Sequence, residues 1–187
     1  MAGLPHFRNS ASAVNHWEPV FKSMFEVTLF PPTGGHPLLI EQVKTVGGLG
    51  DLNPSVAIAE QNYKQATRSY AANPEKTTLD LTITFELNLD DANENFVYTT
   101  MRKWWDLRWN PLTGTSAMKR QYVGTGVIVQ YNRDGSIYRR IDLMEMIPMG
   151  QLQDGLGDLD YKSNDVAVLT AQFRCDCWDE QQIGLNR

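Results

Sequence analysis

The sequence predicts a mostly β protein, a sandwich or barrel-like domain with one α-helix. Residues 79–87 alternate apolar and polar side chains at the period of a strand. An Asn-Arg-Asp-Gly turn at 132–135 joins two apolar runs, as in a β-hairpin. A single long segment, near residues 96–105, has helical periodicity. The 187 residues fit one domain, 1–187, with residues 1–18 as an N-terminal arm and 179–187 as a C-terminal tail.

The first expected strand covers residues 24–30, where Phe25, Val27 and Leu29 share one face. A Pro-Pro-Thr-Gly-Gly run at 31–35 ends it. A second apolar run covers residues 37–46 and stops at the glycines of 47–50. These glycines lack the Lys-Ser/Thr pair of a P-loop and the helix-opening third glycine of a dinucleotide fold, so they predict a turn.

Residues 55–72 have little charge and no apolar face of their own, which is typical of a strand or hairpin with a loosely specified register. The odd-numbered positions carry no charge, whereas Glu60, Lys64 and Arg68 occupy even-numbered positions. The uncharged set is Ala57, Ala59, Gln61, Tyr63, Gln65, Thr67 and Ser69. A segment of this kind needs neighbouring strands.

The clearest strand is 79–87, and an amphipathic helix follows it. Asp90 and Asp91 offer an N-cap, and Glu94 in the first turn complements the helix dipole. The expected buried face consists of Phe96, Val97, Met101, Trp104 and Trp105, with the helix ending by 110–111. The tryptophans could stack on a base or a sugar, but at this spacing core packing is the favoured interpretation.

The C-terminal half is expected to be β structure. After a loop at 111–117, a strand continues through Val123, Val127 and Val129 to residue 131. The return strand covers 136–146 and ends at Pro148, and a polar, acidic stretch occupies 150–165. The last strand, 166–178, places one set of residues on one side: Leu169, Ala171, Phe173, Cys175 and Cys177.

Charge and hydropathy exclude several classes of protein. The net charge of -5 is the opposite of the basic surface that tight DNA binding requires. No apolar run approaches the roughly 20 residues that span a bilayer, and residues 1–16 lack the apolar core of a signal peptide. We therefore expect a soluble protein that folds in the cytoplasm of the cell that makes it.

The sequence predicts no catalytic, cofactor-binding or metal-binding residues, and an enzyme is disfavoured. Cys175 and Cys177 would lie roughly 7 Å apart on a strand, too far for an easy disulfide, and are expected to be ordinary thiols. Neither a Gly-x-Ser-x-Gly nor a His-Glu-x-x-His motif is present. A carboxylate pair of the glycosidase type has no specific support. The four acids of the late polar stretch, Asp154, Asp158, Asp160 and Asp165, do not have calcium-loop spacing.

The order of these elements resembles the tail tube proteins of contractile-tailed bacteriophages, over residues 24–178. The resemblance is carried by Val46-Gly47-Gly48-Leu49, by the 129–135 strand and turn, by Pro148, Leu159-Asp160 and Ser163-Asn164-Asp165, and by Trp178 at the end of the last strand. Two features depart from the family pattern. The arm and the 37–46 run are long, and the tip near Gln61 and Asn62 lacks glycines.

The resemblance implies a structural protein of the virion tail, assembled in the host cytoplasm. Subunits would form six-membered rings, pair strands across subunits and stack into a tube through which DNA passes without tight binding. The implied partners are further copies of the chain, the sheath protein, and the baseplate and tail terminator proteins, with no cofactor and no membrane. A related alternative is the tube of a type VI secretion system or phage-like bacteriocin, which delivers protein. A small-ligand-binding β-barrel with an apolar cavity is the more distant alternative.

The resemblance also assigns a role to the polar segment 55–72. If it were one continuous strand, its odd-numbered positions would share a face, which we expect to line the tube's channel. Neutral or acidic walls leave a polyanion free to slide, whereas each Lys or Arg can pair with a phosphate. A turn near residues 61–62 would exchange the faces and bring Lys64 or Arg68 inward. Alternatively, the uncharged face covers a core.

Overall fold

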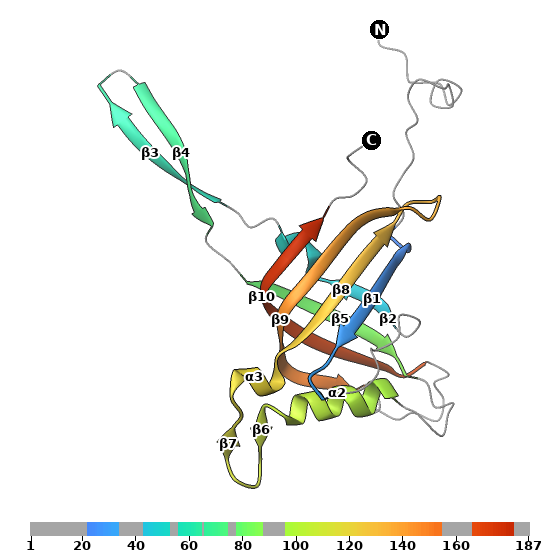
Figure 1. Ribbon diagram of the computed structural model, residues 1–187. Helices are drawn as coiled ribbons and strands as arrows, with labels where there is room; N and C mark the ends of the chain where they lie inside the picture. The colour runs from blue at the N-terminus through green and yellow to red at the C-terminus, as the bar shows by residue number, and fades with distance from the viewer. Residues whose placement is uncertain are drawn as a thin grey trace.

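The computed structural model describes residues 22–33, 43–52, 56–64, 66–74, 78–87, 96–154 and 166–181. Its main element is a six-stranded antiparallel sheet in the order β1-β8-β9-β10-β5-β2. These strands are β1 (Phe25–Phe30), β2 (Val43–Gly47), β5 (Leu79–Glu86), β8 (Gly124–Tyr131), β9 (Ile137–Asp154) and β10 (Val168–Gln181). The sheet curls into a half-barrel, so that its β5–β2 end lies behind β1 and β8 in the view of Figure 1. The predicted mostly β, barrel-like fold is confirmed.

The remaining elements are short helices and two hairpins outside the main sheet. They are the 3-10 helix η2 (Leu49–Leu52), helices α2 (Phe96–Asp106) and α3 (Lys119–Tyr122), and the hairpins β3 (Val56–Tyr63) with β4 (Ala66–Pro74) and β6 (Trp109–Asn110) with β7 (Thr115–Ser116). Helix α2 lies across one end of the half-barrel, and β3–β4 projects from the other end (Figure 1). Among the described residues, no helix is both long and apolar enough to cross a bilayer.

The core lies inside the curl, where alternation along the strands directs apolar side chains. On β5, Leu79, Leu81, Ile83 and Phe85 are at most 1% exposed. Each faces a buried residue of β10 in register: Cys175, Phe173, Ala171 and Leu169 respectively. Each large apolar side chain buried in this way contributes on the order of 1.5–3 kcal/mol of transfer free energy.

Helix α2 closes the core by packing Trp104 directly onto the backbone of β8. The Trp104 side chain is fully buried, its indole N–H donates to the carbonyl of Tyr122 at 2.7 Å, and its ring lies 5.0 Å from that of Phe173. Gly124, an inward position of β8, leaves room for the indole, and Gly126, the next inward position, leaves room for Leu29 and Met146. Val127 and Val129, the apolar residues that marked this strand in the sequence, are only half-buried.

Strand β9 continues beyond its predicted end at Pro148 and reaches Asp154, so the polar stretch expected at 150–165 begins as part of this strand. Proline donates no ladder hydrogen bond and usually marks a strand end. Side chains from the end of α2 and just after it hold this part of β9 through its carbonyl groups. Arg108 donates to the carbonyls of Pro148 at 2.9 Å and Gly150 at 3.1 Å, and the Trp105 indole donates to Gly150 at 3.2 Å.

The inner face of β10 shifts by one residue past Cys175, so the prediction that Cys177 shares its side is wrong. Cys177 is exposed, and Trp178, opposite Leu143, packs against the core instead. The shift lies beside Glu145 of β9, whose φ is 53°. Strand β10 also extends to Gln181, so residues 179–181 are not part of a tail.

Two further boundaries differ from the sequence expectation, and one turn agrees with it. Helix α2 ends at Asp106, earlier than the predicted end at 110–111. The residues that follow form a short hairpin, in which Trp109 and Asn110 of β6 pair with β7. Strand β7 lies inside the segment 111–117 that was expected to be a loop. The turn at 132–135 is present, with Gly135 at a φ of 80° and the Asn132 amide donating to Ser136 O at 2.8 Å. The arm at 1–18, the N-cap at 90–91 and the acids Asp158, Asp160 and Asp165 lie outside the described residues.

Candidate assembly surfaces

Hairpin β3–β4 is the most exposed part of the described chain. Ile58 is 69% exposed, Tyr63 49% and Tyr70 48%, and the hairpin projects away from the sheet (Figure 1). Its side-chain contacts are local. The Thr67 hydroxyl donates to Asn62 at 2.8 Å, and the Arg68 guanidinium lies 5.7 Å from the Tyr63 ring centroid. A two-stranded hairpin is marginal in water on its own.

The register of the hairpin divides the odd-numbered residues between its two faces. The chain reverses between Tyr63 and Ala66, and Gln61 pairs with Arg68 while Asn62 pairs with Thr67. Residues directly opposite in an antiparallel pair share a face, so Ala59, Gln61 and Tyr63 lie with Arg68. The odd-numbered residues therefore do not share one face. A turn does exchange the faces, as in the alternative considered above, but it lies between Tyr63 and Ala66 and not at 61–62. Thr67 and Ser69 lie on the other face with Glu60, and the side chains of Ala57 and Gln65 are outside the described part.

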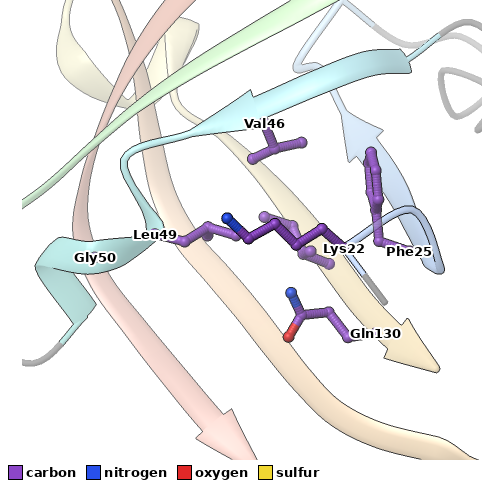
Figure 2. Close-up of a pocket in the computed structure, with 7 residues that line it drawn as sticks. Lys22, Phe25, Val46, Leu49, Gly50 and Gln130 are labelled. Atoms are coloured by element: carbon purple, nitrogen blue, oxygen red, sulfur yellow. The ribbon is translucent and has the colours of Figure 1, made fainter. Parts of the chain in front are cut away.

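The second candidate surface is the open mouth of the half-barrel, between its two edge strands β1 and β2. A cavity of about 440 Å³ opens there, and Figure 2 shows side chains from both edges converging on it. It is lined by Phe25, Val46, Leu49 and Ile128, with Lys22, Gly50 and Gln130. Edge strands present unpaired backbone groups that can accept another strand.

Cations on the outer face of the sheet are held in ion pairs. The closest atoms are 2.8 Å apart in Arg174–Asp80, 3.1 Å in Lys44–Glu86 and 2.8 Å in Arg140–Asp142. The hydrogen bond to Asp80 raises the pKa of Arg174. Pairs this exposed stabilise a fold by about 1 kcal/mol or less. Their larger effect here is to offset positive charge on that face.

A third surface is the apolar tip formed by the β6–β7 hairpin and the residues after it. Leu112 is 94% exposed, Met118 64% and Trp109 51%. This tip lies at the opposite end of the molecule from β3–β4 (Figure 1). Large exposed apolar groups gathered in one place are typical of protein interaction sites.

No catalytic or metal-binding constellation accompanies these surfaces in the ranges that the structure describes. Groups of three or more His, Cys, Asp or Glu suited to a metal ion are absent from those ranges. Burial raises the pKa of the Cys175 thiol to about 12, which keeps it protonated and unreactive at neutral pH. Trp104 and Trp105, considered above as possible stacking residues, are buried in the core together with Val97 and Met101. The Phe96 side chain lies outside the described part.

No protein-family model matches the chain, and no curated protein matches its sequence. Solved structures do match. One is a chain of the sheath–tube complex of an extracellular contractile injection system, PVC, at 14% identity and a TM-score of 0.58, covering 95% of this chain and 99% of that one. Another is a chain of the tube-terminating cap of the anti-feeding prophage, at 14% identity and a TM-score of 0.61, covering 92% of this chain and 97% of that one.

A chain of the anti-feeding prophage baseplate matches at 14% identity and a TM-score of 0.57, covering 90% of this chain and 99% of that one. All three structures are structural assemblies and not enzymes. The predicted relationship to tube proteins of contractile tails is confirmed at the level of the fold. Neither the sequence motifs nor the composition pointed to the mouth between β1 and β2, because it combines segments distant in sequence. The β6–β7 tip is one short stretch, most of which the sequence predicted to be a loop.

Proposed function

We propose that this chain is a tube subunit of a contractile tail or injection machine, which assembles into six-membered rings that stack into a hollow tube. The observation that carries the proposal is the match over 95% of this chain to the sheath–tube complex of a contractile injection system. The exposed hairpin β3–β4 and the open sheet edges support it independently. Within the described part of the chain these edges have no partner strand, whereas strands of neighbouring subunits would satisfy them in a closed ring.

The cargo of the tube is either DNA or protein. Passage of DNA into a host is favoured by the acidic composition, which limits contacts to phosphates. Delivery of protein is favoured by the match to an extracellular contractile injection system. In both cases the partners would be a sheath, a baseplate and a terminating cap, and the location would be the tail of an assembled particle.

The channel wall is the finer part of this proposal. If hairpin β3–β4 contributes to it, the face of Glu60, Asn62, Thr67 and Ser69 suits a polyanion better, since these side chains include no Lys or Arg and Lys64 lies in the turn beyond them. The opposite face presents Arg68 together with Ala59, Gln61 and Tyr63. An arginine there would bind phosphates and retard DNA.

Concentrated protein is expected to form six-fold rings or tubes. The reason is that burial of unpaired strand edges between subunits is favourable and the contact is self-propagating. Electron microscopy and sedimentation over a range of concentrations measure it. A chain that stays monomeric at every concentration, with no rings or tubes in micrographs, contradicts the proposed function.

Backbone amides of β3 and β4 are expected to exchange hydrogen rapidly in the monomer and to become protected on assembly. The hairpin buries too little apolar surface to offset the entropy of ordering it. Amides of β5, in the middle of the core, are the control and should be protected in both states. Equal, strong protection of β3–β4 in a verified monomer would show that the hairpin needs no neighbour.

A further inference from the structure

The cavity in the mouth of the half-barrel has the size and composition of a small-molecule binding site. Its volume of about 440 Å³ lies within the range of roughly 300–1,000 Å³ that is usual for such sites, which combine apolar walls with a few polar groups. Its walls come from Phe25, Val46, Leu49 and Ile128, which belong to four different elements of the fold. Apolar walls in contact with water are unfavourable, so an apolar ligand that covers them gains free energy.

The polar groups of the cavity are one cation and one neutral amide. Figure 2 shows the Lys22 side chain extending across the cavity toward Leu49, and the Gln130 amide facing the same space. Within the described ranges, no carboxylate lines the cavity. These groups match a ligand head that carries a single negative charge and accepts hydrogen bonds, which is the chemistry of a carboxylate. A phosphate carries about two negative charges and is usually bound by a cluster of cations.

The walls specify the other end of the ligand. Three of the four wall residues are aliphatic and lie on β2, η2 and β8. A flexible hydrocarbon chain can follow such walls and contact both edges of the curled sheet. We propose that the mouth binds an aliphatic chain with a terminal carboxylate, with the chain between β1 and β2 and the carboxylate at Lys22. The proposal goes beyond the proposed function and is tested on the monomer.

Titration of the full chain with decanoate, below the concentration at which decanoate forms micelles, tests the site. Calorimetry should show saturable binding with a negative heat-capacity change, because apolar surface is buried. The midpoint of thermal unfolding should rise, since the ligand binds the folded chain. Octanoate should bind about tenfold more weakly, because it buries two methylene groups fewer. Decyltrimethylammonium has the same chain and a positive head, and should bind at least about fivefold more weakly than decanoate.

Two variants assign the binding to the cavity. Gly50 lines it, has no positive φ, and a Cβ there meets nothing within 4 Å, so Gly50→Trp places an indole in the space. Decanoate should bind this variant about tenfold or more weakly, through lost burial of its chain. Lys22→Gln should weaken decanoate binding by about twofold to fivefold, as for an exposed ion pair, and leave binding of the uncharged decanol unchanged. Gly50→Ala and Lys44→Gln are the controls and should bind like the wild type, because Lys44 pairs with Glu86 outside the cavity.

Circular dichroism checks that each variant is folded, and Gly50→Leu replaces Gly50→Trp if the tryptophan variant is unfolded. Folded wild-type chain that shows no saturable binding of decanoate overturns the proposal. Equal affinity for decanoate and decyltrimethylammonium overturns the pairing with Lys22 and therefore the carboxylate. Wild-type affinity in folded Gly50→Trp places the binding elsewhere and also overturns it. Each of these results leaves the proposed function standing, because ring formation is measured separately.

Discussion

Replacement of Trp104 by alanine is expected to lower the free energy of unfolding by about 3–5 kcal/mol. The side chain is fully buried between α2 and the sheet, stacks near Phe173, and its indole N–H donates to the Tyr122 carbonyl. The variant leaves a cavity and a carbonyl without its donor. A loss of this size is a large share of a domain's total stability. Urea unfolding followed by circular dichroism measures it.

Trp109 provides a control of the same residue type. Its side chain is 51% exposed on the β6–β7 tip, so Trp109→Ala should change stability by no more than about 0.5 kcal/mol. The Trp105 side chain is 6% exposed and donates a hydrogen bond to the Gly150 carbonyl. Trp105→Ala should therefore also lower the free energy of unfolding strongly. Fully stable protein from both core variants would mean that α2 does not cover the core.

Gly124→Ala is expected to destabilise the fold by about 1–3 kcal/mol, although it adds a single methyl group. A Cβ at this position would lie 2.5 Å from Cζ2 of Trp104 and 2.8 Å from the backbone carbonyl oxygen of Phe30. Either α2 must move off the sheet or β1 and β8 must separate. Thermal and urea unfolding of the purified variant give the change in free energy.

A double-mutant cycle identifies the indole as the obstacle. In a Trp104→Phe background part of the clash disappears, so Gly124→Ala should be less harmful there, with a coupling free energy of at least about 0.5 kcal/mol. The remaining contact with Phe30 predicts incomplete relief. Gly50→Ala, where the added Cβ meets nothing within 4 Å, is the matched control and should be neutral within about 0.5 kcal/mol. Strict additivity of the two changes would place the cost elsewhere.

Local patterns in the sequence determined the elements whose burial follows a simple period. Alternation along residues 79–87 predicted β5 and its inward side chains, and the spacing of Val97, Met101, Trp104 and Trp105 matches the face that α2 buries. Asn132–Gly135 specified its turn because glycine adopts the positive φ that the reversal needs. The order of the elements, together with the motifs at 46–49, 129–135 and 159–165, resembles that of tail tube proteins and so implied the fold.

Tertiary contacts decided what local patterns do not encode. Pro148 signalled a strand end, yet β9 continues past it, and Arg108, 40 residues earlier in the chain, donates to the Pro148 carbonyl. The register of β3 against β4 places Arg68 beside the uncharged residues, because a shift of one residue moves a side chain to the opposite face. Gly124 gave no apolar signal, although Trp104 packs directly against it. The mouth between β1 and β2 exists only because the sheet curls and brings its two edges together, which no short stretch of sequence specifies.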